Sequence, residues 1–350
     1  MSTLSTAVTW RRDLHAHPEV GFTEFRTASR VAARLGVPAA LPITESDAAD
    51  HVPVREGFRS THEGEMHACG HDGHVGMAVE LAERLAADPP AGTVRLLFQP
   101  AEEGGRGAAA MVPAGVVDDV DVLLAAHLGI GLAGGTVAAA VDGLLANTKM
   151  RAVFRGVAAH AAMAPQDGRS ALLAAAAATL AVHTTPPFPG HETRVAVGAL
   201  HGGTSSNIVP DRAEVLLETR ADAGAVNEEI EARVRRALEG AAATWGTTVE
   251  VERIGAVTTA VADAAAADAV ARAARGGGLA VVVPTAELGV ASDDATAFMR
   301  RVQERGGAAT YLGIGSALAG PHHTPGFDLD EAVLAPGVDL LERTVRDLTG

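Results

Sequence analysis

Short apolar runs of strand length alternate with segments of helical periodicity along most of this 350-residue chain. Such alternation is typical of α/β proteins, in which helices cover a sheet. The predicted strands of the outer parts are residues 93–98, 120–126 and 308–314. Residues 120–126 are so apolar that both faces of this strand should be buried. The predicted helices are residues 6–35 with a break at His17-Pro18, 75–87, 262–275 and 329–348.

A different order of elements fills the middle of the chain. From about Thr148 onward the patterns predict a strand, a helix, two strands, a helix and a strand, which is the order of a ferredoxin-like fold. The segments are 149–154, 168–183, 194–200, 213–220, 227–243 and 247–252. We therefore expect two domains: residues 1–147 plus 257–350, and an insert over residues 148–256.

Composition excludes several classes of protein. The formal net charge of −15 argues against non-specific nucleic-acid binding, which needs clustered Lys and Arg. The single cysteine excludes an intrachain disulfide and fits a reducing compartment, so we expect a cytoplasmic protein. The N-terminus has no signal-peptide pattern, and the apolar stretch 171–182 is too short to span a bilayer, so no membrane association is expected.

The densest cluster of reactive side chains is Met66–His74, which holds the only cysteine, three histidines and an aspartate. Cys69 and His71 are two residues apart, and in an extended segment both side chains would point the same way. A thiolate beside an imidazole is a plausible half-site for zinc or a similar divalent ion. A polar loop with a buried free cysteine explains the cluster equally well, and the cluster alone leaves both interpretations open.

Other candidate ligands follow predicted strands. Glu102 and Glu103 come just after residues 93–98, and His127 comes directly after residues 120–126. Ligands of open α/β sheets bind outside the carboxyl ends of the strands, where one carboxylate can bind metal while another moves protons. Taken singly, an exposed acidic turn and a core histidine are the commoner explanations. A loop after the last strand adds His322-His323-Thr-Pro, which alone would be a solvated turn.

The motifs together resemble a known family, the dinuclear metallo-amidohydrolases related to aminoacylase and glutamate carboxypeptidase. Within it they are most similar to the branch of hippurate hydrolase, the indole-acetyl-amino-acid hydrolases and p-aminobenzoyl-glutamate hydrolase. The resembling segments run nearly end to end in the family order. They are 11–26, 66–74, 98–105, 158–161, 203–210, 292–296 and 322–330.

The resemblance implies a mixed-sheet, metallopeptidase-like catalytic domain with an inserted ferredoxin-like α+β domain that acts as lid and dimerisation domain. It implies two divalent metal ions per subunit, Mn²⁺ or Zn²⁺, held by Cys69, His71, Glu103, His127 and His323. His322 is the alternative to His323, which is preferred because it lies two residues before Pro325.

The resemblance also implies roles in hydrolysis of the amide bond of N-acyl or N-aroyl amino acids. Glu102 would be the general base that activates a metal-bridging water. His160 would polarise the scissile carbonyl in the active site of a partner subunit. Asn207 and Arg220 would hold the carboxylate of the substrate. The expected partners are the small N-acyl amino acid and either a second copy of the chain or a related subunit.

The sequence departs from the family pattern in its first half. Leu35-Gly-Val-Pro38 runs almost directly into Ala40-Leu-Pro-Ile-Thr-Glu45, where the family has several core strands and an acidic motif. Ala39 stands where the family has an aspartate, and Ala291 where a glycine usually precedes Ser-Asp/Glu-Asp. Two functions therefore stay open: a working amidohydrolase, or a catalytically impaired subunit that binds metal and dimerises.

Overall fold

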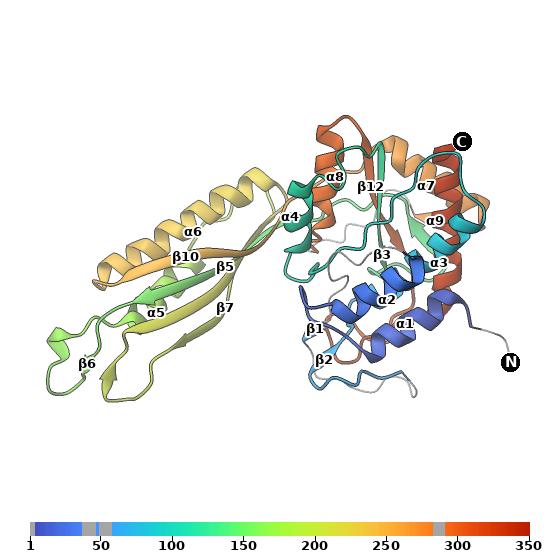
Figure 1. Cartoon of the computed structure of the whole chain (residues 1–350). Helices are drawn as coiled ribbons and strands as arrows, with labels where there is room; N and C mark the ends of the chain where they lie inside the picture. The colour runs from blue at the N-terminus through green and yellow to red at the C-terminus, as the bar shows by residue number, and fades with distance from the viewer. Residues whose placement is uncertain (1–3, 37–46, 49–57, 283–290) are drawn as a thin grey trace. The chain divides into compact units, whose positions relative to one another are not determined.

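The computed structural model describes residues 4–36, 47–48, 58–282 and 291–350. The chain forms two compact units (Figure 1). Unit 1 is made of Met1–Gly143, Ala260–Gly289 and Asp293–Gly350, and unit 2 of Leu144–Thr259 and Val290–Ser292. The break between Gly36 and Ala40, and Ala39 itself, lie outside the described residues.

Unit 1 is built around a mixed four-stranded sheet in the order β11-β4-β12-β3. The strands are β3 (Val122–Leu128), β4 (Thr136–Ala138), β11 (Ala280–Val282) and β12 (Ala308–Ile314). β12 is parallel to β3 and antiparallel to β4, whereas β11 is parallel to β4. β1 (Asp47–Ala48) and β2 (Glu65–Met66) form a separate, short antiparallel pair.

Helices cover this sheet and close the core of unit 1. They are α1 (Thr6–Ala16), α2 (Phe25–Leu35), α3 (His71–Ala87), α4 (Gly107–Met111), α7 (Ala264–Gly276), α8 (Ala295–Glu304) and α9 (Leu334–Thr349), with the 3-10 turns η1 (Val112–Ala114) and η3 (Glu331–Val333). α3 packs against both α1 and α9. The core is aliphatic, and buried Leu128, Leu312 and Val338 belong to its largest cluster. Small and branched side chains fill it because aromatic residues make up only 3% of the chain.

The helix at the N-terminus is interrupted as the sequence predicts. Ser5 caps α1 by accepting a hydrogen bond from the amide of Val8 at 3.3 Å. α2 ends at Leu35 and is followed by Gly36, whose φ of 70° is the left-handed conformation typical of a residue after a helix. Buried Trp10 and Leu14 of α1 pack with Val75 and Val79 of α3. These contacts fix the start of α3, which carries the candidate site.

One predicted strand is not formed. Residues 93–99 are irregular, although Val94 and Leu96 pack against the core of unit 1. A strand needs a hydrogen-bonded neighbour, and in the described part of the chain no strand pairs with this segment. The strand predicted at residues 120–126 is observed as β3, but it lies at the edge of the sheet and several of its side chains are only half-buried. The prediction that both its faces are buried is wrong.

Unit 2 has the element order that the sequence predicts. Its antiparallel sheet has the order β10-β5-β9-β7. The main elements are β5 (Ala146–Arg155), α5 (Ala171–His183), β7 (Thr193–Gly202), β9 (Arg212–Ala221), α6 (Gly224–Thr244) and β10 (Thr248–Val257). Both helices contact the sheet and each other, and their buried side chains, among them Ala175 and Val234, form one core with Phe154. A short pair, β6 (Ala159–His160) with β8 (Ile208–Val209), and the 3-10 turn η2 (Pro165–Asp167) complete the unit.

The fold class is therefore the predicted mixed α/β architecture with an inserted ferredoxin-like unit. Helices predicted at 262–275 and 329–348 are found as α7 and α9, and the strand 308–314 is β12. None of the helices in the described part has the length and hydropathy that a membrane span requires.

Candidate metal centre

The start of α3 brings Cys69 beside two histidines. Gly70 precedes α3 with φ 91°, a left-handed turn that side chains rarely adopt. Cys69 and His71 therefore flank a turn and do not lie in an extended segment. The expectation that an extended backbone turns both side chains the same way is wrong, although the two side chains do converge. Ligand atoms of Cys69, His71 and His127 lie within 4.8 Å of one another, and all three residues are buried.

His127 is the penultimate residue of β3, not the first residue after the strand. Its Nδ1 lies 2.8 Å from the carbonyl oxygen of Leu128, so Nδ1 carries the proton and Nε2 keeps its lone pair. Nε2 lies 3.5 Å from the Sγ of Cys69. Burial, and to a smaller extent His71, lower the pKa of His127 to about 3, so the ring is neutral at pH 7. A neutral imidazole with a fixed tautomer is ready to accept a cation.

Glu102 and Glu103 lie in a tight turn between Phe98 and α4, close to two of the histidines. The Oε2 of Glu102 lies 3.5 Å from the Nε2 of His71. Ligand atoms of His71, Glu102 and Glu103 fall within 4.8 Å of one another. A carboxylate pair beside an imidazole can divide metal binding and proton transfer between its members.

The structure brings His323, not His322, into a group of this kind. The Nε2 of His323 lies 3.3 Å from the Oε1 of Glu103, and Cys69, Glu103 and His323 form a third group within 4.8 Å. The residue has φ 60°, an uncommon value for a non-glycine, and its amide donates to the carbonyl oxygen of Ala68 at 2.8 Å. The His322 ring packs instead near Phe327, with 5.0 Å between centroids.

The donor set fits a divalent metal. All five predicted ligands occur in overlapping groups that share Cys69, His71 or Glu103. A thiolate, neutral imidazoles and a carboxylate are ligands that zinc and manganese accept in proteins. Because the groups overlap without coinciding, the donors can be shared between two neighbouring positions.

The sequence motifs gave no role to His74, which supports His127. The Nε2 of His74 accepts a hydrogen bond from the amide of Leu128 at 3.0 Å, and its ring centroid lies 4.6 Å from that of His127. Burial, together with the neighbouring His127, lowers the pKa of His74 well below its usual value. The third histidine of the Met66–His74 cluster thus holds the end of β3 and is not in any of the candidate ligand groups.

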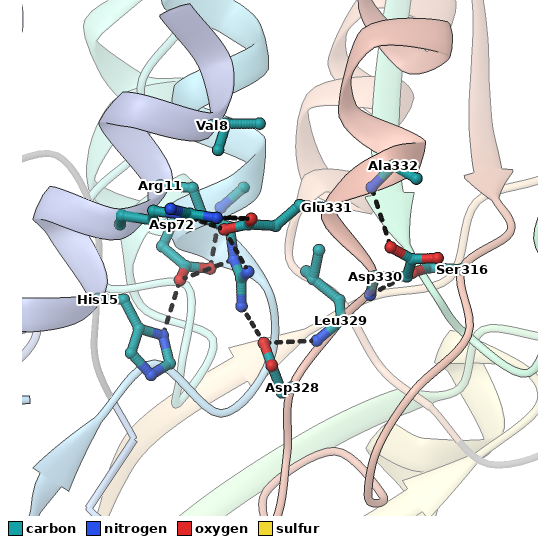
Figure 2. A network of polar contacts seen from close by, with 12 residues as sticks. Val8, Arg11, His15, Asp72, Ser316, Asp328, Leu329, Asp330, Glu331 and Ala332 are labelled. Carbon is teal, nitrogen blue, oxygen red and sulfur yellow. Dashed lines mark hydrogen bonds and ion pairs between the residues drawn. The ribbon is translucent and has the colours of Figure 1, made fainter. Parts of the chain in front are cut away.

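A buried arginine joins α1 to the start of α3 and to the segment around Asp328, as Figure 2 shows. The Arg11 side chain is 0% exposed, and its Nη1 lies 2.9 Å from Glu331 while its Nε lies 3.5 Å from Asp72. Its Nη2 forms an ion pair with Asp328. Asp72 also lies 2.9 Å from the Nδ1 of His15. The network ties the first turn of α3, which contains His71, to the segment that follows the His323 loop.

The charges of this network keep Asp72 ionised. Burial alone raises the pKa of Asp72, but the guanidinium of Arg11 and then His15 outweigh it, so the pKa lies well below the usual range. Asp72 also accepts the amide of Gly73 at 2.9 Å. No short sequence pattern signals this network, because Arg11 and Asp328 are 317 residues apart.

The remaining predicted site residues belong to unit 2. The Nδ1 of His160 accepts hydrogen bonds from the amides of Ala162 at 3.2 Å and Met163 at 3.1 Å. The proton of the neutral ring therefore sits on Nε2, which can donate. The backbone carbonyl oxygen of Asn207 accepts a hydrogen bond from the backbone amide of Ala161 at 2.9 Å, so Asn207 is a neighbour of His160.

Arg220 lies far from this pair within unit 2. Its guanidinium contacts Glu218 at 2.7 Å. The eight steps along β9 from Arg212 to Arg220 span roughly 26 Å, and β8, which pairs with β6, comes just before the Arg212 end. The structure brings His160 and Asn207 together but does not bring Arg220 to them within one chain.

The chain is thus a two-unit α/β protein with a cluster of candidate metal ligands. The chain belongs to peptidase family M20/M25/M40, whose family model matches residues 40–347. It is accordingly an enzyme of the amidohydrolase and peptidase class.

Named relatives and a solved structure agree with this assignment. The chain is 44% identical to one of the subunits of p-aminobenzoyl-glutamate hydrolase from Escherichia coli K12 over 311 residues, which cover 87% of this chain and 71% of that protein. It is 37% identical to indole-3-acetyl-aspartic acid hydrolase of Enterobacter agglomerans, with 96% of this chain and 94% of that protein covered. The crystal structure of an aminobenzoyl-glutamate utilization protein from Klebsiella pneumoniae superposes with a TM-score of 0.81 at 37% identity, covering 97% of this chain and 95% of the other.

The alignment with the Enterobacter enzyme is longer than this chain. It runs over 409 residues, whereas this chain has 350. The relative therefore contains stretches without a counterpart here, as the sequence departure after Gly36 leads one to expect.

Proposed function

We propose that the chain hydrolyses the amide bond of N-acyl or N-aroyl amino acids, with p-aminobenzoyl-glutamate-like compounds as substrates. Cys69, His71, Glu103, His127 and His323 would hold two divalent ions, Mn²⁺ or Zn²⁺. Bound there, such ions would supply Lewis-acid polarisation of the scissile carbonyl and of the attacking water. The observation that carries the proposal is that all five side chains fall in overlapping groups of ligand atoms within 4.8 Å, together with Glu102.

Glu102 is the proposed general base. Its carboxylate lies 3.5 Å from the Nε2 of His71, beside the ligand groups. It would take a proton from the attacking water and deliver it to the nitrogen of the leaving amine, so that the C–N bond breaks and an acid and an amine result. Removing a group of this kind typically lowers the rate by about 10²–10⁴-fold.

His160 is the proposed donor to the carbonyl oxygen, and it would act in the partner subunit's site. Its Nδ1 is occupied by two backbone amides, which leaves Nε2–H as the donor. Asn207, its neighbour, would bind the substrate carboxylate. Because Arg220 lies at the far end of β9, roughly 26 Å along the strand from Arg212, one carboxylate could reach both Asn207 and Arg220 only if two subunits contribute.

Dimerisation through unit 2 is supported by its surface. α5 carries Leu173 and Leu180, which are 48% and 73% exposed. Exposed apolar side chains on one helix favour a protein partner. The partner would be a second copy or a related subunit, and the predicted domain roles, catalytic for residues 1–147 plus 257–350 and lid for residues 148–256, belong to this proposal. The single cysteine supports a cytoplasmic location.

Mixed dimers test the contribution across subunits. Glu102→Ala and His160→Ala should each be inactive alone, but their mixture should regain about a quarter of the wild-type activity, since half of the dimers are hybrids with one intact site. Failure to regain activity, although hybrids form, would place both groups in the same subunit. Substrate class is tested by amine release from a panel of N-aroyl and N-acyl amino acids, with Glu102→Ala as control.

The second candidate function is a metal-binding, dimerising subunit without turnover. The irregular backbone of residues 93–99, where a strand was expected, favours it, because that segment leads directly to Glu102. A related protein is named as one subunit of a hydrolase, which fits a division of labour between chains. A folded, metal-loaded protein without turnover on every member of the panel would favour this function.

A further inference from the structure

The turn that carries Glu102 and Glu103 has an unfavourable backbone conformation. Ala101 has φ 49°, a left-handed value that is uncommon outside glycine. Its carbonyl oxygen accepts the amides of Arg106 at 3.3 Å and Gly107 at 3.0 Å, which closes the turn. Such conformations persist only where the surroundings enforce them.

Asp294, before α8, joins the two ends of this turn. The residue is 1% exposed. Its Oδ1 accepts the side-chain amide of Gln99 at 2.5 Å, and its Oδ2 accepts the backbone amide of Ala108 at 2.9 Å. The ends also touch each other, because a Cβ on Gly107 would stand 1.7 Å from the carbonyl oxygen of Pro100.

Asp294 is itself fixed to the central sheet. The hydroxyl of Tyr311 on β12 donates to the neighbouring Asp293 at 2.7 Å. Asp293 also accepts the amide of Ala295 at 2.8 Å. The start of α8 therefore cannot shift without breaking contacts to a buried strand.

Glu24 holds the middle of the turn from another part of the chain. It is 0% exposed and lies at the start of α2. Its Oε1 accepts the amide of Ala101 at 2.9 Å, one residue before Glu102. The strained residue is thus bonded on its amide side by Glu24 and on its carbonyl side by the turn itself.

We propose that Glu24 and Asp294 are positioning residues that hold the Gln99–Ala108 turn so that Glu102 and Glu103 face His71 and His323. The inference rests on the proposed function, in which Glu102 is the general base and Glu103, His71 and His323 are metal ligands. Glu24 is in none of the groups that could hold a metal, and Asp294 shares one with Glu102 and Asp293 but with none of Cys69, His71 and Glu103. Outer groups that orient ligands typically change metal affinity or activity by about 10–100-fold.

The chain offers a matched control for Asp294. Asp263, before α7, also accepts a glutamine side chain and a backbone amide, from Gln303 at 2.7 Å and Ala309 at 2.8 Å. These partners belong to α8 and β12, not to the turn. Asp263 is half-buried, so Asp263→Asn should cost less stability, but it changes hydrogen bonds of the same kind without disturbing Glu102 or Glu103.

The experiment compares Asp294→Asn and Asp263→Asn by hydrogen exchange and by Mn²⁺ affinity, measured by competition with a chromogenic chelator. In Asp294→Asn the amides of Ala101 and Ala108 should exchange at least about tenfold faster, and Mn²⁺ should bind about 10–100-fold more weakly. Asp263→Asn should leave both unchanged. Gln99→Met, which removes one side-chain contact only, replaces Asp294→Asn if that variant does not fold.

Turnover separates positioning from general loosening. Asp294→Asn should lower kcat about 10–100-fold with KM nearly unchanged, because Glu102 acts on the water and not on the bound substrate. Glu24→Ala should do the same, and Ala101→Gly in that background should restore part of kcat, since glycine adopts positive φ without strain.

The outcomes are distinct. Unchanged exchange of the turn in Asp294→Asn overturns the inference whatever the activity is. Faster exchange with unchanged Mn²⁺ affinity and kcat also overturns it. A wild-type protein that binds no Mn²⁺ and has no turnover overturns the proposed function and the positioning role together, whereas wild-type turnover with equal values in the two variants overturns the positioning role alone.

Discussion

Replacing Arg11 by methionine should destabilise unit 1 by several kcal/mol. The guanidinium is fully buried between Asp72, Asp328 and Glu331, whose side chains are 1%, 4% and 9% exposed. In Arg11→Met, Asp72 would keep its hydrogen bond with His15, but Asp328 would lose its ion pair with Arg11. Leaving buried carboxylates without their cation costs about 3–5 kcal/mol.

Arg12→Met is the matched control. Arg12 also binds Glu331, at 2.6 Å, but its side chain is 35% exposed. Solvent screens an ion pair of this kind, so the expected loss is about 0–1 kcal/mol. The two variants remove the same residue type from neighbouring positions of α1 and differ in burial.

Urea unfolding followed by Trp10 fluorescence measures both losses. The chain has two tryptophans, so a Trp245→Phe background leaves Trp10, buried between α1 and α3, as the reporter of unit 1. The pKa of Asp72 is depressed in the folded state, so its stabilisation is full above about pH 4 and is lost as the pH falls further. The gap between wild type and Arg11→Met should therefore be widest at neutral pH and shrink in acid.

Equal losses in the two variants at pH 7 would refute this reasoning. A gap that widened on acidification would also refute it, because the depressed pKa of Asp72 requires the opposite sign.

Three further predictions concern the site itself. Cys69→Ser should weaken Zn²⁺ binding at least about tenfold and reduce proton release on binding, because a thiolate ligand is lost; calorimetry in two buffers measures both. Gly107→Ala should cost about 1–3 kcal/mol and reduce turnover, because its Cβ would meet a carbonyl oxygen at 1.7 Å; thermal unfolding and kcat check this, and a neutral result would contradict it. Burial holds the pKa of His67 at about 4 and that of His127 at about 3, with the pKa of His74 also well below normal. In the unfolded chain these histidines bind protons below about pH 6.5, whereas in the folded protein they stay neutral. Chelator-treated protein should therefore lose stability as the pH falls below about 6.5, and a urea midpoint that stays constant down to about pH 5 would contradict this.

Sequence patterns predict the fold well because they reflect local burial. The helix patterns at 6–35 and 262–275 and the strand pattern at 308–314 correspond to observed elements. The strand predicted at 93–98 is not formed, because a strand needs hydrogen bonds to a neighbouring strand. No strand in the described part of the chain pairs with this segment, and its local sequence does not reveal that. Apolar alternation records burial, and this segment does contribute Val94 and Leu96 to the core.

The candidate site could be predicted as a set of residue types but not as a geometry. Cys69 and His71 converge because Gly70 is left-handed and α3 starts at His71, which their spacing does not reveal. The contacts of Arg11 with Asp328 and of Asp294 with Ala108 join residues 317 and 186 positions apart. Contacts at such separation leave no local pattern, so the sequence does not show which of these residues meet.

Metal titration of turnover tests the central proposal most directly. The release of glutamate from p-aminobenzoyl-glutamate is measured while Mn²⁺ or Zn²⁺ is added back to chelator-treated protein, with Glu102→Ala in parallel. Wild-type activity should rise until two ions are bound per chain, and the variant should bind the same two ions without turnover. A folded wild-type protein with two bound ions and no turnover, or a variant that keeps full activity, would contradict it.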